Sequence, residues 1–286
     1  MTSFFLDRFN WNVEFLIQPV IWLIMLVFLG IKALKMISVQ PIIKDAFYFQ
    51  KIANFIINWA FWGVIMIGVS DTLLSFMRVE GFQNYFPFLE HLLISGSFRG
   101  VYIYYPMLVF AFFLALRRNH FSFVWLIFLV VIAELLIVIA RFVFSYEQPF
   151  MGDLVRFWYA AMFLFASAHT LFQGGHVRVD VLYATFSDGK KNLVNFMGSI
   201  FLGIPLCWII LIMGMSGKTS IIISPIINFE ASQSSFGLSV KYFMAGFLMI
   251  FAISMLAMFS AYAANCLSQL LGEKSDLKRF TDQSAH

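Results

Sequence analysis

The sequence predicts an all-α protein, a polytopic bundle of about seven transmembrane helices. Of its 286 residues, 61% are hydrophobic and only 12% are charged, whereas about 25% of the residues of an ordinary soluble domain are charged. The mean hydropathy is +0.86. The apolar runs reach the roughly 20 residues that a helix needs to cross the hydrocarbon core. Lipid admits only helices and closed barrels, and these runs are too long and too continuous for barrel strands.

The first three of the expected helices lie before residue 118. The full set of apolar runs is 14–34, 54–77, 98–116, 122–145, 155–173, 193–215 and 239–270. The first run contains Glu14, Gln18 and Pro19, so it either crosses the membrane or lies in its interface. The second run carries Asp71 near its end, and the third carries tyrosines such as Tyr104, whose rings suit a membrane interface.

The fourth and fifth runs must be antiparallel neighbours, because the short link YEQPFMGD at 146–153 joins them. Glu134 lies midway along the fourth run, where a carboxylate is costly and should face protein or a wet cavity. Arg141 follows seven residues later on the same face, about 10 Å further along the axis. A structural polar contact, a proton relay and a contact between subunits all stay open for Glu134. Gly174 and Gly175 end the fifth run.

The last two runs are interrupted or unusually long. Pro205 lies within 193–215 and should kink that helix. The run 239–270 could form a helix of about 30 residues, roughly 45 Å long, which either tilts or continues out of the membrane. Small residues at helical spacing in 155–173 and 239–270 favour close helix packing, either inside the bundle or against another membrane subunit.

Lysine and arginine predict the orientation. If Arg117–Arg118 and Lys190–Lys191 face the cytoplasm, that side holds twelve of the 19 basic residues, and seven, such as Arg99, lie on the other side. The positive-inside rule then favours an outside N-terminus and a cytoplasmic C-terminus. Without a crossing at 14–34, the N-terminus would lie inside.

Several function classes find no support in the sequence. The net charge of +4 comes without a basic run, so no nucleic-acid partner is expected. No catalytic residue, cofactor-binding residue or metal ligand set is predicted, and no enzyme activity or cofactor is expected. The helices from 122 onward carry few polar groups at depth, and we expect few buried ionisable groups overall. Such a chain is poorly equipped to carry a polar solute alone and better suited to support a partner that does.

The segment G-G-H-V-R-V-D-V-L at 174–182 directly follows an apolar helix and favours a more specific interpretation of the function. It resembles the signature of the small membrane subunit (Q-type) of tripartite ATP-independent periplasmic (TRAP) transporters. Weaker similarities are R-F-V-F at 141–144, D-L-V-R-F at 153–157 and N-F-E-A-S at 228–232. The resemblance covers about residues 120–270.

The resemblance divides the chain into three parts. These are an N-terminal extension with about three helices at 1–118, a four-helix small-permease domain at 119–271, and a polar cytoplasmic tail at 272–286. The extension departs from the family, which usually has four helices; widening the bundle, lipid binding and contact with another protein stay open as its role. The family also often has an aromatic residue and a glutamate where this chain has Met151, Gly152 and Asp153.

The family implies a multi-pass protein of the bacterial inner membrane in an ion-gradient-driven importer of organic acids. The small subunit braces the large (M-type) membrane subunit and helps to dock the periplasmic solute-binding protein, and these are its expected partners beside the lipid bilayer. By position and resemblance, the structural and partner-binding motif is Gly175, His176, Arg178 and Asp180. The expected contacts at the membrane boundary or with subunits are Glu134, Arg141, Asp153, Arg156 and Glu230. A stand-alone carrier or channel and a membrane-bound redox subunit are the alternatives.

Overall fold

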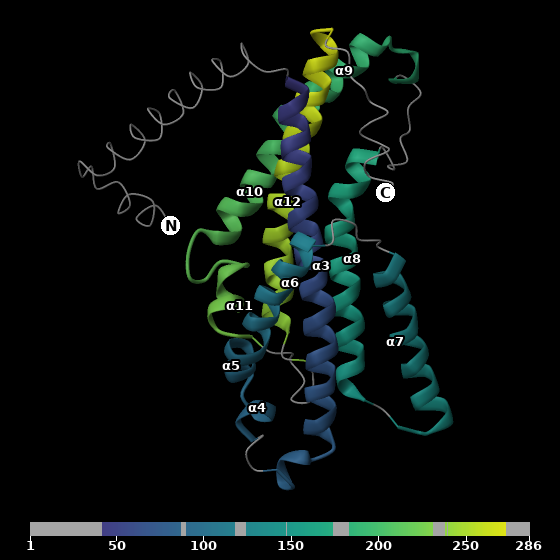
Figure 1. Ribbon diagram of the computed structural model, residues 1–286, viewed down its shortest axis with the longest axis vertical. Coiled ribbons are helices and arrows are strands. Elements are labelled where there is room, and N and C mark those ends of the chain that lie inside the picture. The colour runs from purple at the N-terminus through teal and green to yellow at the C-terminus, as the bar shows by residue number, and fades with distance from the viewer. Residues whose placement is uncertain are drawn as a thin grey trace, which may run out of the picture.

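The computed structural model describes most of the chain as a bundle of long helices (Figure 1). The described residues are 42–86, 90–117, 124–146, 148–173, 183–230, 238 and 240–272. Within these ranges every regular secondary-structure element is a helix, and short turns or bends connect the helices. The predicted helix 14–34 and the predicted tail 272–286 lie outside the described residues, except for the first residue of the tail.

The central helix is α3 (Ile42–Val79), which has 38 residues. At 1.5 Å per residue it is about 57 Å long, and it begins earlier than the predicted run 54–77. Its buried positions recur every three or four residues, for example Ala53, Ile57 and Phe61. It packs against α6, α8 and α12, which are described below. The predicted run begins later because Lys44 and Lys51 are charged and the continuous apolar pattern begins only after them.

The third predicted helix is confirmed as a continuous helical stretch. After the short η1 (Phe82–Asn84) and α4 (Glu90–Ile94), α5 (Gly96–Arg99) continues through the π-helical η3 (Gly100–Tyr104) into α6 (Tyr105–Arg117). The side chain of Ser95 caps this stretch by accepting a hydrogen bond from the Phe98 amide at 3.3 Å.

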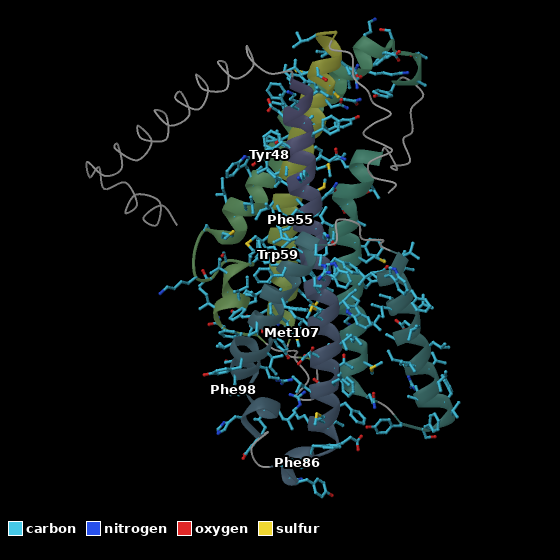
Figure 2. The ribbon with its side chains drawn as sticks, in the orientation of Figure 1. Tyr48, Phe55, Trp59, Phe86, Phe98 and Met107 are labelled. Atoms are coloured by element: carbon cyan, nitrogen blue, oxygen red, sulfur yellow. The ribbon has the colours of Figure 1, made fainter. Side chains whose placement is uncertain are left out.

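Helix α6 packs closely along α3. Trp59 Nε1 of α3 donates a hydrogen bond to the Leu108 carbonyl at 2.8 Å, and the rings of Phe55 and Phe112 meet edge to face at 5.4 Å. Phe55, Trp59 and Met107 are labelled in Figure 2 where the two helices meet. The second and third predicted helices therefore form a pair.

The fourth and fifth predicted helices are α7 (Val124–Val143) and α8 (Pro149–Gln173). They are packed neighbours, joined by a short link at one end of the bundle (Figure 1), as predicted. Helix α8 lies against α3 and α12, whereas α7 stands at the edge of the bundle and packs mainly against α8. Most of the apolar residues of α7 are therefore exposed.

The last predicted helices are also present. After η4 (Tyr183–Thr185), α9 (Asp188–Gly198), η5 (Ser199–Gly203) and α10 (Ile204–Met215) form one helical stretch. Pro205 is the second residue of α10, two residues after the end of the π-helical η5, and a residue without an amide hydrogen is tolerated next to such an irregular turn. A Cβ on Gly203 would lie 2.6 Å from the Phe259 ring, so glycine is what lets this stretch approach α12.

Helix α12 (Lys241–Leu270) has 30 residues and follows the short α11 (Ile223–Ile227). Figure 1 shows it antiparallel to α3 at the centre of the molecule. Among the described residues, five helical stretches are long and apolar enough to cross a membrane. They are Ile42–Val79, Gly96–Arg117, Val124–Val143, Asp188–Met215 and Lys241–Leu270. The all-α transmembrane fold is confirmed.

Candidate functional site

A buried charged cluster joins α3 to the stretch that contains α5 and η3. Arg99 Nη1 lies 2.8 Å from Asp71 Oδ1, and the Tyr104 hydroxyl donates a hydrogen bond to the same carboxylate oxygen. Asp71, Arg99 and Tyr104 are all 0% exposed. A buried charge is tolerated only when it is paired and hydrogen-bonded. Here Arg99 pairs with the Asp71 carboxylate, and the Tyr104 phenol donates a hydrogen bond to it.

The cluster is covered by aromatic side chains from the start of α12. Tyr104 meets Phe243 edge to face at 5.8 Å, and Phe243 lies 4.2 Å from the ring of its neighbour Tyr242. A Cβ on Gly100 would lie 2.8 Å from the Phe229 ring and 3.0 Å from the Tyr242 hydroxyl. Glycine at this position lets the helical stretch approach α12, so the ion pair is sealed between three elements.

One of the predicted boundary residues, Asp153, ties the start of α8 to the segment before α12, and a second, Arg156, pairs with it. Asp153 Oδ2 accepts a hydrogen bond from the Leu238 amide at 3.2 Å, and its Oδ1 lies 3.5 Å from Arg156 Nη1. The Arg156 side chain is 78% exposed. The carboxylate of Asp153 thus has a structural partner inside the chain, while the guanidinium of Arg156 extends into the surroundings.

Glu230 lies next to the same segment. Its Oε2 is 3.0 Å from Lys241 Nζ, and its carbonyl accepts a hydrogen bond from the Tyr242 amide at 3.1 Å. Both charged side chains of this pair are partly exposed. Because Tyr242 also covers the Asp71–Arg99 pair, Glu230, Lys241 and the buried cluster belong to one region around the start of α12.

Glu134 and Arg141 lie on α7, outside this region. Both side chains are exposed, and Glu134 stands midway along the helix between exposed apolar residues such as Val131 and Leu135. The described chain therefore does not provide the protein surroundings that a carboxylate at this depth needs.

The link between α7 and α8 is held to the end of α3. The Tyr146 hydroxyl donates a hydrogen bond to Glu80 Oε1, and this bond raises the pKa of the exposed Tyr146 phenol. Since the phenol keeps its proton to higher pH than a free tyrosine, it remains a donor throughout the physiological range. The predicted motif residues Gly175, His176, Arg178 and Asp180 lie outside the described residues.

Sequence reasoning missed the Asp71–Arg99–Tyr104 cluster. The expectation of few buried ionisable groups is wrong for this part of the chain, where an acid and a base are both fully buried. The available signal was an aspartate within an apolar run, together with an arginine at the start of the next run. Their pairing could not be read from spacing, because the two residues lie on separate elements.

The comparisons with known proteins identify a family. A family model described as "Tripartite ATP-independent periplasmic transporters, DctQ component" matches residues 127–270, about half of the chain. No curated protein and no solved structure matches the chain. The matched segment contains α8, α9, α10 and α12 and most of α7, whereas α3, α5 and α6 precede it.

Proposed function

The chain belongs to the DctQ component family of tripartite ATP-independent periplasmic transporters, and from this we propose its particular role. It is a membrane component of such a transporter, with several helices able to cross the membrane. We propose that it does no chemistry, braces the large membrane subunit of an ion-gradient-driven importer of organic acids, and helps to dock the periplasmic binding protein. The observation that carries this role is the uncovered apolar surface of α7 around Glu134.

Helix α7 supports a contact with the large subunit. Phe128, Val131 and Leu135 are each more than half exposed, and Glu134 lies among them. A charged side chain at the centre of a bilayer costs about 2.5–3.5 kcal/mol on insertion scales. A polar group of the large subunit opposite Glu134 would remove most of this cost, so we place that subunit on this face.

Helix α10 offers a second uncovered face. Trp208, Ile209, Ile212 and Met213 are all more than half exposed. Helix α10 packs on α12 within the chain, so its opposite side is available to lipid or to the large subunit. A brace with contact faces on both α7 and α10 would hold the large subunit more firmly than one helix could.

The region around the start of α12 is our candidate for docking the binding protein. Arg156, Glu230 and Lys241 present partly or largely exposed charges there, at the bundle end that the basic residues predict to be periplasmic. Exposed charges of both signs favour a reversible, salt-sensitive contact. The buried Asp71–Arg99 pair would stiffen the platform beneath them.

The proposed role of the HVRVD motif as an anchor can be tested with Asp180→Ala. We expect this variant to lower the yield of the assembled complex and the uptake of substrate, because Asp180 would anchor the cytoplasmic loop to the large subunit. The measurement is recovery of the large subunit with the tagged chain, together with uptake in whole cells.

The matched control is Asp188→Ala, which removes an exposed aspartate from the first turn of α9 nearby in the sequence. Its yield and uptake should equal those of the unchanged chain. Normal assembly and normal uptake in Asp180→Ala would remove the motif from this role.

A further inference from the structure

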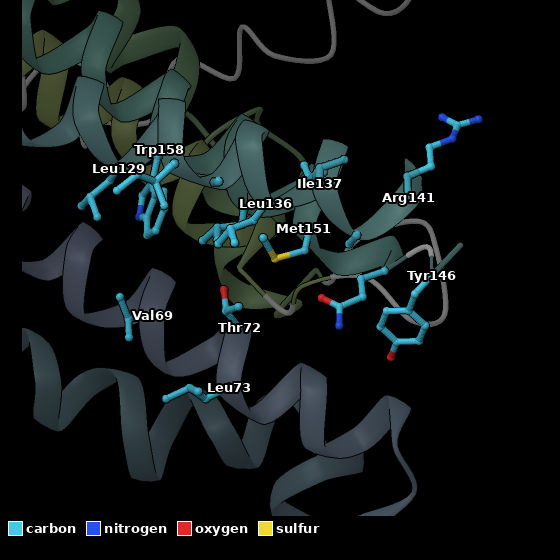
Figure 3. A pocket seen from close by; sticks show the side chains of 16 residues that line it. Val69, Thr72, Leu73, Leu129, Leu136, Ile137, Arg141, Tyr146, Met151 and Trp158 are labelled. Carbon is cyan, nitrogen blue, oxygen red and sulfur yellow. The ribbon is translucent and has the colours of Figure 1, made fainter. Parts of the chain in front are cut away.

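Helix α7 is covered on one side only. Its buried residues, Leu126 and Ala133, lie seven positions apart on one side, and the helix packs mainly against α8. Next to that side, Leu129 and Leu136 face Leu73 of α3 across an apolar groove of about 830 Å³ between α3, α7 and α8 (Figure 3). The remaining side of α7 is directed away from the bundle, because the helix stands at its edge (Figure 1).

The uncovered side of α7 carries a seven-residue repeat. Val124, Val131 and Val138 recur there and are 67%, 58% and 49% exposed. Ile127 and Glu134 follow the first two valines by three residues each. Such spacing gives the a and d positions of a heptad, the pattern of helices that pack side by side at a shallow angle, and β-branched residues at a favour a pair of helices. We call these five residues the heptad seam of α7.

Glu134 lies at the middle of the heptad seam. Helix α7 has 20 residues and is therefore about 30 Å long, which is roughly the thickness of the hydrocarbon core. A residue midway along it lies near the midplane of the bilayer. Glu134 is exposed, and among the described residues it makes no hydrogen bond or ion pair. A carboxylate at this depth needs protein or water beside it, so the seam needs an occupant that brings a hydrogen-bond donor.

The charge of Glu134 selects that occupant. Two copies of this chain enter the membrane in the same orientation, so a contact between their α7 helices would be parallel and would place the two Glu134 carboxylates opposite each other. Like charges at such a contact repel. Acyl chains offer no donor at the midplane. A helix of a different subunit with a basic side chain at this depth fits both the repeat and the charge.

We propose that one membrane helix of the large subunit packs along the heptad seam, with a basic side chain paired with Glu134. This contact rests on the proposed function and specifies its geometry and chemistry. A heptad repeat implies a left-handed pair of helices that cross at about 20°. A polar residue at a single position of such a pair fixes the register of the two helices. The Glu134 pair would therefore hold the large subunit at one height relative to this chain.

Site-specific crosslinking tests the position of the contact. A photoreactive benzoylphenylalanine replaces either Val131 on the seam or Leu136 in the groove, in the full chain produced together with the large subunit in native membranes. The two side chains are similarly exposed, at 58% and 51%, so Leu136 is the matched control. We expect an adduct with the large subunit from position 131 and none above background from position 136.

The outcomes separate this contact from the proposed function. Equal adducts from the two positions, or an adduct of position 131 with a second copy of this chain, would overturn the seam contact even if the large subunit still co-purifies. A large subunit that does not co-purify with the unchanged chain would overturn the proposed function, and the seam contact with it.

Variants of Glu134 test the chemistry of the contact. Glu134→Leu removes a charge that is costly in lipid, so a carboxylate that faced lipid would leave the complex unchanged. For a carboxylate paired with a basic residue, we expect recovery of the large subunit with the tagged chain to fall about tenfold, because the charge of the partner is left buried and unpaired. Glu134→Gln keeps an acceptor for the donor and should lower recovery by only about threefold.

Glu90→Gln is the control, since it removes an exposed carboxylate from the first residue of α4, away from the seam. It should recover the large subunit as the unchanged chain does. Thermal unfolding of the isolated chains in detergent should show that the Glu134 variants fold, so that a loss of recovery reports on the contact. Full recovery of the large subunit with Glu134→Leu would contradict the proposed pair.

Discussion

The buried pair of Asp71 and Arg99 is the strongest single-residue feature of the described chain. Two charges removed from water lose several kcal/mol of hydration each, and their mutual attraction offsets this only when the geometry is good and the remaining polar atoms are bonded. Here the separation is 2.8 Å, and the Tyr104 hydroxyl provides a further bond to the carboxylate. We infer that the pair specifies how α3 and α5 fit together, more than it adds net stability.

Loss of only one partner of the pair should be strongly destabilising. Asp71→Ala leaves the Arg99 charge buried without its carboxylate, and we expect it to destabilise the protein by about 3–5 kcal/mol. The measurement is thermal or denaturant unfolding of the purified full chain in detergent. Arg156→Ala is the control, because removal of an exposed ion-pair partner costs about 0–1 kcal/mol.

A double-mutant cycle separates pairing from packing. The double variant Asp71→Ala with Arg99→Ala should cost less than the sum of the two single variants, since it leaves no unpaired charge. Strictly additive costs would mean that the two side chains do not interact in the membrane.

At the level of elements, α3 is joined to the helices of the family-matched segment by close contacts that require glycine. Trp158 of α8 packs into the notch at Gly68 of α3, where a Cβ would lie 2.4 Å from the indole Nε1. The buried indole cannot move away easily, since Trp158 is 5% exposed. The notch therefore fixes the distance between α3 and α8, and with it the width of the apolar groove.

Gly68→Ala should force α3 and α8 apart. We expect it to destabilise the chain by about 1–3 kcal/mol, the usual cost of overpacking, although alanine is the better helix former. The measurement is the unfolding midpoint, with Trp158 fluorescence as a local probe in a chain whose other tryptophans are replaced. Gly198→Ala is the matched control, because its Cβ would meet nothing within 4 Å and it should be neutral or slightly stabilising. Equal midpoints for the two variants would contradict a tight α3–α8 contact.

At the level of the whole molecule, the described helices present wide apolar faces outside, and one pair of opposite charges, Asp71 and Arg99, is buried between them. The described helices place Asp71 and Arg99 against each other and away from any opening. A solute pathway needs accessible polar groups near the midplane, and the exposed Glu134 on the edge helix does not form one with its apolar neighbours. This arrangement suits a component that supports transport by a partner.

Reconstitution into liposomes tests whether transport requires the large subunit in addition to this chain. Liposomes that contain only this chain should accumulate no organic acid under an imposed sodium gradient, because the helices that the structure describes offer no polar path for one. Liposomes that also contain the large subunit, supplied with the binding protein, should accumulate substrate, as measured with labelled organic acids. Accumulation by the chain alone would contradict the proposed role and favour a stand-alone carrier.

The sequence by itself determined the fold class, the positions of six described helices and the family. These properties follow from local composition, since a run of about 20 apolar residues is enough to specify a membrane helix, and a short link is enough to make α7 and α8 neighbours. The roles of Asp153 and Glu230 as membrane-boundary or subunit contacts stay predictions, and their partners inside the chain, Leu238 and Lys241, emerged only from the structure.

The tertiary structure alone decided which residues meet. Asp71 and Arg99 lie 28 positions apart on separate elements, and the apolar groove has walls from three helices. Neither could be predicted, because in a membrane chain nearly every helix face is apolar and periodicity no longer tells which face is buried. The early start of α3 was missed for a different reason, because the charged Lys44 and Lys51 interrupt the apolar pattern in its first turns.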